Sequence, residues 1–207
     1  MDKIKKIDFS FIKSTKTKKV VVAFHGWQGN KDSFLPLVKN PLFNDYNWFL
    51  LQGPYRVNND PNRRTWSYEL EPNNWAYEEP KQIIHNFFKD EVFNKFESKD
   101  VYVIGFSLGA LVCYEYICSM NETLGGIFPV SGFMRSKIIN LNPSQIKTPI
   151  VIGHGENDSI VPVERSIEAY KALKAENANV EFTTYDAQHH IPIKMLTKIS
   201  QKIKNTP

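Results

Sequence analysis

The middle of the chain carries a serine in the spacing of an enzyme nucleophile. Residues 105–109 read Gly-Phe-Ser-Leu-Gly, and the apolar run Val101–Ile104 precedes them while a helical pattern follows. A strand that turns directly into a helix strains the backbone at the turn, and flanking glycines remove β-carbons that would collide there. The helix N-terminus favours negative charge that develops at the serine oxygen. The pattern therefore predicts that Ser107 attacks a carbonyl carbon.

An acid that orients a catalytic histidine is expected after a later strand of the same sheet. Asp158 lies in the segment His154–Pro162, which follows the predicted strand Ile150–Ile152. An aspartate at this place can also be a turn or cap residue before the next helix. We expect Asp158 to be the orienting acid, with Glu156 as the alternative.

A base is expected in the loop after the last strand, because that loop returns over the nucleophile. The predicted strand Val180–Tyr185 is followed by two adjacent histidines, His189 and His190. We favour His189, because a single residue separates it from the apolar anchor Ile191, and His190 is the alternative. The chain order of serine, aspartate and histidine is then that of hydrolases with this type of nucleophile turn.

A glycine-containing loop follows the predicted strand Val20–Phe24 and begins with His25 and Gly26. A loop at this place can direct a backbone N–H at the carbonyl oxygen, which becomes negative when the serine attacks. We expect the amides of Trp27 and Leu108 to be the two donors. His25 itself is interpreted as a residue that braces the loop.

Apolar runs along the chain predict the strands and helices that hold these residues. The predicted strands are Ile7–Ile12, Val20–Phe24, Trp48–Leu51, Val101–Ile104, Gly126–Val130, Ile150–Ile152 and Val180–Tyr185. The predicted helices are Ser33–Phe43, Lys81–Phe96, Leu108–Met120, Val163–Asn177 and Pro192–Ile203. This alternation predicts a single α/β domain over residues 1–207, with a mostly parallel sheet of about seven strands and helices on both faces. Sites in such folds lie outside the carboxyl ends of the strands, where the motifs above begin.

Two segments between these elements bear on access to the serine. Gly53–Pro80 has no helical or strand periodicity, and we interpret it as a long functional loop. Ser131–Pro149 has room only for a short connection, so no large cap domain is expected. We expect the long loop, together with Phe133 and Met134, to control access of the substrate to Ser107. Phe106 and Phe133 are candidates for contacts with the substrate.

The composition is that of an ordinary globular protein and argues against several functional classes. The net charge is only +4, and the N-terminal lysines alternate with apolar residues as in an edge strand, which argues against nucleic-acid binding. No pattern of metal ligands or phosphate-binding glycines occurs, so neither a metal nor another cofactor is expected.

The cellular setting is inferred from cysteines and apolar runs. Cys113 and Cys118 are badly spaced for a disulfide within one predicted helix and are expected to be buried thiols in a reducing compartment. No apolar run reaches the ~18 residues of a membrane span, and no signal segment is seen. We therefore expect a cytoplasmic protein without stable membrane insertion.

Together these motifs resemble those of the α/β-hydrolase superfamily and, more narrowly, of the small phospholipase/carboxylesterase family, which includes the acyl-protein thioesterases. The resemblance is carried by residues 25–29, 105–109, 154–162 and 189–191, which span nearly the whole chain. It implies a sheet with Ser107 on its nucleophile turn, no cofactor, and Trp66 as an aromatic residue near the substrate. Two departures are visible, since many members carry glutamine in place of Leu108 and glycine in place of Gln188.

The residues and the resemblance together predict a serine hydrolase that cleaves the carboxylic ester of a small molecule through an acyl-enzyme. A thioesterase would use the same residues with a different leaving group, and a peptidase would cleave an amide. A binding protein with an unused triad is the non-enzymatic alternative. The acyl group, the leaving group and the oligomeric state stay open.

Overall fold

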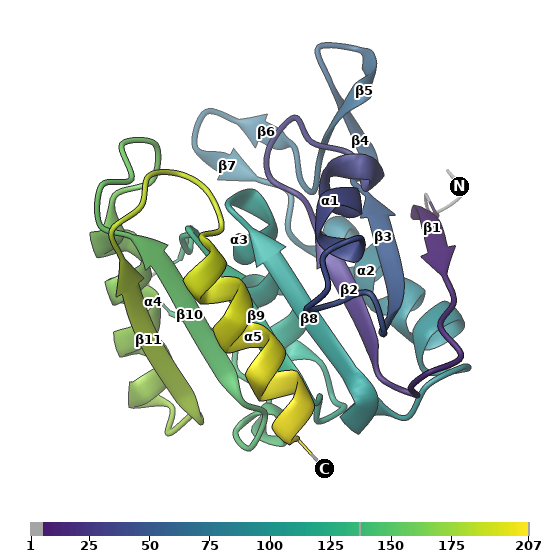
Figure 1. The fold of residues 1–207 in the computed structure, drawn as a ribbon. Coiled ribbons are helices and arrows are strands. Elements are labelled where there is room, and N and C mark those ends of the chain that lie inside the picture. Colours follow the sequence, from purple (N-terminus) through teal and green to yellow (C-terminus); the bar gives the residue numbers. More distant parts are fainter. Residues whose placement is uncertain (1–5, 137, 207) are drawn as a thin grey trace.

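The structure, a computed structural model, describes residues 6–136 and 138–206. A seven-stranded sheet runs through it in the order β1-β3-β2-β8-β9-β10-β11 (Figure 1). Its strands are β1 (Asp8–Ile12), β2 (Val20–Phe24), β3 (Asn47–Gln52), β8 (Val101–Phe106), β9 (Gly126–Val130), β10 (Ile150–Gly155) and β11 (Val180–Tyr185). The first strand, β1, pairs antiparallel with β3, and the other neighbouring strands pair parallel. The prediction of a mostly parallel sheet is confirmed.

The central strands are buried on both faces, which explains their continuous apolar sequences. In β2, the side chains of Val20, Val22 and Phe24 belong to the core on one face. Those of Val21 and Ala23 belong to the core on the other face. All five side chains are at most 1% exposed, so both faces of this sheet need a cover of helices.

One face of the sheet is covered by α1 (Leu35–Val38) and α5 (Ile193–Asn205), as Figure 1 shows. Leu37 of α1 and Met195 of α5 pack in one buried cluster with Trp48 of β3. Leu37 of α1 and Leu196 of α5 also line one cavity together with His25 and His189, so both helices border the loops that carry these histidines.

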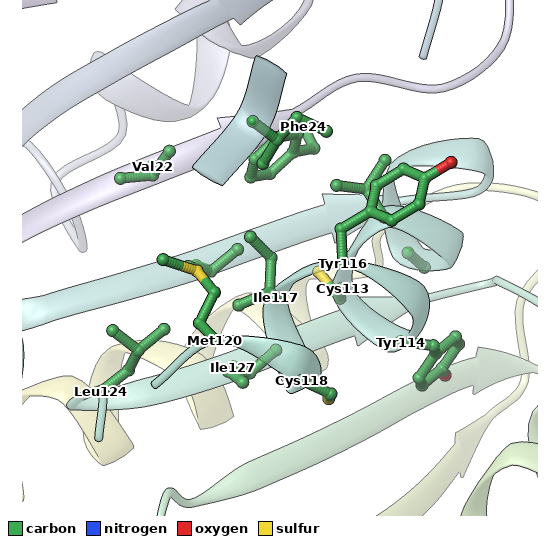
Figure 2. Close-up of a cluster of buried hydrophobic side chains, with 14 of the residues drawn as sticks. Val22, Phe24, Cys113, Tyr114, Tyr116, Ile117, Cys118, Met120, Leu124 and Ile127 are labelled. Carbon is green, nitrogen blue, oxygen red and sulfur yellow. The ribbon is translucent and has the colours of Figure 1, made fainter. Parts of the chain in front are cut away.

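The opposite face is covered by α2 (Glu78–Phe87), α3 (Leu108–Glu115) and α4 (Val163–Ala175). Figure 2 shows the part of this core around Cys113 and Cys118. Both thiols are free and buried, as predicted. Burial raises the pKa of Cys118 to about 12, so this thiol stays protonated and unreactive at neutral pH.

The predicted helix Ser33–Phe43 is wrong in its bounds. The structure has a 3-10 helix at Lys31–Phe34, capped by the side chain of Asn30, and then the single turn of α1. Pro36 lies at the start of α1, where a missing N–H leaves no hydrogen bond unmade. Two short helices with separate starts therefore replace one long one.

Two other predicted helices are interrupted. After Phe87, α2 passes into a π-helix (Phe88–Val92), and α3 ends at Glu115 before a 3-10 helix (Ile117–Ser119). Phe88 and Val92, at the two ends of this π-helix, are both fully buried. The predictions Lys81–Phe96 and Leu108–Met120 are right about helical backbone and wrong about a continuous α-helix.

The prediction of a structureless segment at Gly53–Pro80, called the excursion below, is wrong. It contains two hairpins, β4 (Tyr55–Val57) with β5 (Asp60–Thr65), and β6 (Glu69–Glu71) with β7 (Asn74–Trp75). The first hairpin turns at Asn58 and Asn59, whose φ angles of 51° and 58° are those of a two-residue turn of type I′. Most side chains of these strands are exposed, so no alternation of apolar residues marks them.

The segment Ser131–Pro149 is predicted to be too short for a large cap domain. In its described part, the connection from β9 to β10 contains the 3-10 helix Pro143–Gln145, which is too short to form a cap domain. Within residues 6–136 and 138–206, none of the helices has the length and apolar character to cross a membrane.

Candidate active site

Ser107 occupies the turn between β8 and α3 in a strained conformation. Its φ is 55° and its ψ is −114°, outside the regions that non-glycine residues ordinarily adopt. A β-carbon on Gly105 would lie 2.2 Å from Gly109 O, and one on Gly109 would lie 1.9 Å from Phe24 O. Both glycines are therefore required by the close approach of the backbones. The Ser107 N–H donates to Val130 O at 2.9 Å, which ties the turn to β9.

A continuous chain of hydrogen bonds joins Ser107 to His189 and Asp158. His189 Nε2 lies 3.0 Å from Ser107 Oγ, and His189 Nδ1 lies 2.7 Å from Asp158 Oδ2. The three residues follow β8, β11 and β10, so the parallel sheet brings them to one edge. Because the carboxylate accepts from Nδ1–H, Nε2 is left as an acceptor for the serine hydroxyl. This arrangement can pass the serine proton to the imidazole as the oxygen attacks.

The Asp158 carboxylate is held by several donors. Its Oδ1 accepts from the N–H groups of Ile160 at 3.0 Å and Val161 at 2.9 Å. Nε2 of a second buried histidine, His154, lies 3.4 Å from the same Oδ2 that His189 contacts. Burial raises the pKa of Asp158, but the hydrogen bonds from Val161, His189 and Ile160 outweigh burial and lower it. Asp158 is therefore an anion at neutral pH.

The two alternatives weighed from the sequence lie outside this chain of hydrogen bonds. Glu156 is exposed, and its Oε1 accepts from Thr184 Oγ1 at 2.6 Å. The His190 side chain is also exposed, one residue beyond the ring that reaches the serine. The geometry therefore favours Asp158 over Glu156 and His189 over His190.

The loop after β2 lies directly against the nucleophile. A β-carbon on Gly26 would come within 3.3 Å of Ser107 Cβ. Among the residues that the structure describes, the N–H groups of Trp27 and Leu108 donate to no protein acceptor. Trp27 itself is 63% exposed. Both amides are available to a substrate oxygen.

His25 braces this loop as a neutral ring. Its Nε2 accepts from the Gly53 N–H at 3.0 Å, so Nδ1 carries the proton and donates to Gly26 O at 2.7 Å. Trp66 Nε1 donates to the His25 carbonyl at 2.8 Å. Burial lowers the pKa of His25 to about 4, so the ring is neutral at physiological pH. These contacts agree with the interpretation of His25 as a structural residue.

Comparison with known proteins decides the family. Residues 9–206 match the family described as phospholipase/carboxylesterase. The chain belongs to the phospholipase/carboxylesterase family. Acyl-protein thioesterase 1 of Kluyveromyces lactis is 24% identical to it over 201 residues, which cover 86% of this chain and 87% of that protein.

Other members of the phospholipase/carboxylesterase family add to this relation. A rice protein (Oryza sativa subsp. japonica) named a probable inactive carboxylesterase is 28% identical over 112 residues, which are 53% of this chain and 46% of the rice protein. The crystal structure of the Bacillus cereus carboxylesterase matches with a TM-score of 0.81, over 97% of this chain and 95% of that one, at 20% identity. This likeness shows the α/β-hydrolase fold. The chain is thus a member of an esterase and thioesterase family built on that fold.

Three aromatic residues were predicted to contact the substrate, and the structure buries them to different degrees. Trp66 is fully buried and supports the His25 loop through its indole N–H, so its expected place beside the substrate is corrected. A buried indole N–H needs a partner, and the His25 carbonyl supplies it. Phe106 is half-buried, with its ring 4.8 Å from that of His189. Phe133 is half-buried, with the Arg165 guanidinium 5.9 Å from its ring centre.

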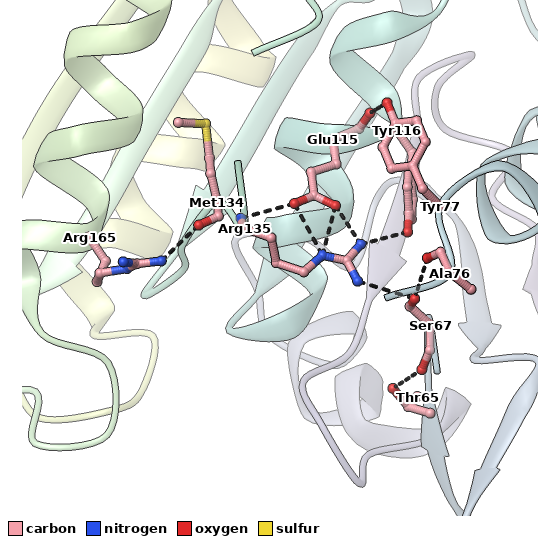
Figure 3. Close-up of polar contacts among 9 residues, drawn as sticks. All are labelled: Thr65, Ser67, Ala76, Tyr77, Glu115, Tyr116, Met134, Arg135 and Arg165. Carbon is pink, nitrogen blue, oxygen red and sulfur yellow. Dashed lines mark hydrogen bonds and ion pairs between the residues drawn. The ribbon is translucent and has the colours of Figure 1, made fainter. Parts of the chain in front are cut away.

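A second polar cluster, which the sequence analysis missed, is centred on Arg135 (Figure 3). Arg135 Nε lies 3.0 Å from Glu115 Oε2, and its two Nη atoms donate to Ser67 Oγ at 3.2 Å and Tyr116 OH at 2.9 Å. The guanidinium also lies 5.7 Å from the ring centre of Trp75. The Arg135 cluster ties the excursion to α3 and to the loop after β9. One signal was available, because Glu115 is the sole charged residue in an otherwise apolar predicted helix.

Proposed function

We propose that this protein is a serine hydrolase that cleaves carboxylic esters through Ser107, His189 and Asp158. The observation that carries the proposal is the continuous chain of hydrogen bonds from Ser107 Oγ to the Asp158 carboxylate, with contacts of 3.0 and 2.7 Å. Membership in the phospholipase/carboxylesterase family supports it. The strained turn at Ser107 supports it as well, because strained backbone is concentrated at functional sites.

Acylation begins when Ser107 Oγ attacks the carbonyl carbon and His189 Nε2 takes its proton. The carbonyl oxygen becomes an oxyanion, and the N–H groups of Trp27 and Leu108 donate to it. The bond between the carbonyl carbon and the leaving oxygen then breaks, and the His189 proton passes to that oxygen. Asp158 stabilises the imidazolium while it exists.

Deacylation repeats these steps with water in place of the alcohol. His189 takes a proton from the water as it attacks the acyl-enzyme, and the same two amides hold the second oxyanion. The bond to Ser107 breaks and the serine recovers its proton from His189. The free acid leaves, and no cofactor takes part in the proposed steps.

A thioesterase is the second candidate, and a specific observation favours it. The relative from Kluyveromyces lactis, which matches over most of both chains, is named an acyl-protein thioesterase. The same residues would act, and only the leaving atom would change from oxygen to sulfur. Turnover of matched oxygen esters and thioesters with the same acyl group separates the two, and a matched amide tests for a peptidase.

The function is tested with p-nitrophenyl acetate, butyrate and octanoate, using wild type and Ser107→Ala. We expect the variant to lose on the order of 10⁶ in kcat, by analogy with dissected triads. Ser136→Ala, at an exposed serine outside the site, is the matched control and should keep full activity. Retained activity in Ser107→Ala would contradict the proposal.

A fluorophosphonate probe separates an enzyme from a protein with an unused triad. The probe reacts with an activated serine, and mass spectrometry of the labelled peptide should locate it on Ser107. The labelling experiment is needed because one relative is named a probable inactive carboxylesterase. Absence of labelling, together with no hydrolysis of any ester, would favour the non-catalytic alternative.

A further inference from the structure

A cavity of about 370 Å³ opens beside the proposed triad on the face of the sheet that α1 and α5 cover. Its inner wall includes Gly26, Phe106 and His189. Each of these lies against Ser107, because Gly26 approaches its β-carbon, Phe106 precedes it in the chain and His189 Nε2 contacts its Oγ. The cavity therefore ends where the proposed reaction takes place.

The rest of the cavity wall is mostly apolar. It includes the side chains of Phe34, Pro36, Leu37, Ile191 and Leu196. In the part of the chain that the structure describes, no lysine, arginine, aspartate or glutamate lines it. Burial of an apolar group against such a wall is favourable, and apart from three histidines (His25, His189 and His190) the described wall carries no ionisable side chain.

Two polar residues of the wall already have partners of their own. Ser33 Oγ accepts from the Asn30 N–H at 3.0 Å, within the cap of the 3-10 helix. Asn40 Oδ1 accepts from the Leu42 N–H at 3.0 Å. These two oxygens therefore serve the local turns, and the exposed ring of His190 is the other polar side chain of the wall outside the proposed triad and the His25 brace. The volume of the cavity is at the small end of the range for ligand pockets.

The position of His189 decides which part of a substrate belongs in this cavity. In acyl transfer, the proton that His189 takes from Ser107 must reach the leaving atom, so the leaving group has to lie within hydrogen-bond reach of Nε2. His189 and the Phe106 ring beside it form part of the cavity wall. A group that extends from the leaving atom along this wall enters the cavity.

We propose that this cavity binds the leaving group, and that the leaving group is an uncharged apolar alcohol or thiol. The inference rests on the proposed function, because it is the proton transfer by His189 that assigns the cavity to the leaving side. The acyl chain then lies outside this cavity, and a substrate with a charged leaving group is disfavoured.

The test uses two matched series of aliphatic esters, followed by acid release in a pH-stat. One series keeps the acetyl group and lengthens the alcohol from ethyl to hexyl, and the other keeps ethanol and lengthens the acid. For wild type we expect kcat/KM to rise about fourfold per methylene in the alcohol series, until the cavity is filled. A flat alcohol series would overturn the proposal without any variant being needed.

A variant that fills the cavity sharpens the test. Leu196→Trp places a large ring in the cavity, and Ile193→Trp, at a residue 60% exposed on the same helix, is the matched control. We expect Leu196→Trp to lower kcat/KM for hexyl acetate on the order of 100-fold and to flatten the alcohol series, while the slope of the acid series stays unchanged. Circular dichroism and the midpoint of thermal unfolding check that both variants fold.

The outcomes separate this inference from the proposed function. If Leu196→Trp flattens the acid series and leaves the alcohol series intact, the cavity binds the acyl chain and the inference is wrong, while the hydrolase stands. If the fluorophosphonate probe does not label Ser107 and no ester is cleaved, the proposed function fails and the leaving-group site fails with it. Loss of the alcohol slope in Leu196→Trp alone, with Ser107 labelled, supports both.

Discussion

The proposed triad and the Arg135 cluster are both partly buried networks of polar side chains, but they are completed in different ways. In the Arg135 cluster, a permanent charge is met by the Glu115 carboxylate and by the oxygens of Ser67 and Tyr116. In the triad, the chain of contacts runs in one direction and ends at Ser107 Oγ. A saturated network holds segments together, whereas a network with a free end next to a cavity can pass a proton to a ligand.

The largest effect expected from this difference is at Asp158. In Asp158→Asn, the amide no longer favours the tautomer of His189 in which Nε2 accepts from the serine, so kcat should fall about 10⁴-fold with the fold intact. The measurement is hydrolysis of p-nitrophenyl butyrate, with thermal unfolding as a check on folding. Glu156→Gln is the control, because Glu156 is exposed and outside the network, and it should keep its activity. Equal losses in both variants would contradict the assignment of the acid.

The Arg135 cluster should show the reverse pattern. Arg135→Met leaves the Glu115 carboxylate, whose side chain is 10% exposed, without its cation, so the free energy of unfolding should fall by about 3–5 kcal/mol. The kcat of the remaining folded protein should change by less than about threefold, because no cluster residue touches Ser107. Urea denaturation and ester hydrolysis on one preparation measure both quantities.

An exposed ion pair supplies the control for Arg135. Arg63→Met breaks the pair between Arg63 and Asp60, which are 54% and 39% exposed, and should change the stability by less than about 1 kcal/mol. Loss of activity without loss of stability in Arg135→Met would contradict the view that the Arg135 cluster is structural and only the proposed triad is catalytic.

The smallest effect concerns the His25 brace and pH. The folded pKa of about 4 lies below the unfolded value of 6.5, so the unfolded chain binds a proton first as the pH falls. The stability that His25 contributes is complete above pH 6.5 and is lost toward pH 4, by about 3 kcal/mol. Burial also lowers the pKa of His85 and His154, so the difference between wild type and His25→Gln isolates the His25 share. Parallel pH curves for the two proteins would contradict the prediction.

The central strands of the sheet were predictable, because burial on both faces requires unbroken apolar sequences. Val20–Phe24 and Gly126–Val130 have the same bounds in the sequence prediction and in the structure. The edge strand Val180–Tyr185 also has the predicted bounds, although most of its side chains are only half-buried. The excursion was not predictable by that signal, because most side chains of its hairpin strands are exposed. The adjacent Asn58 and Asn59 were the available sign, since asparagine tolerates the positive φ that the turn requires.

The proposed site was predictable for a related reason. Ser107, Asp158 and His189 each lie just after a recognisable strand, and parallel strands end at one edge. Arg135 meets Glu115 because of the path of the loop after β9. An irregular loop has no sequence periodicity from which that path could be predicted. Trp66 was assigned to the substrate because an aromatic type alone does not say which way a ring points, and the hydrogen bond to His25 decided it.

The strained turn at Ser107 has a consequence for laboratory evolution of heat-resistant variants. A non-glycine residue at a φ of 55° and ψ of −114° costs about 1–3 kcal/mol, which the rest of the fold supplies. Replacing Ser107 by glycine relieves that strain and removes the nucleophile at the same time. A library of variants sorted only for heat resistance would therefore enrich proteins that last longer and catalyse nothing, and a search for durable forms has to screen for turnover in the same round.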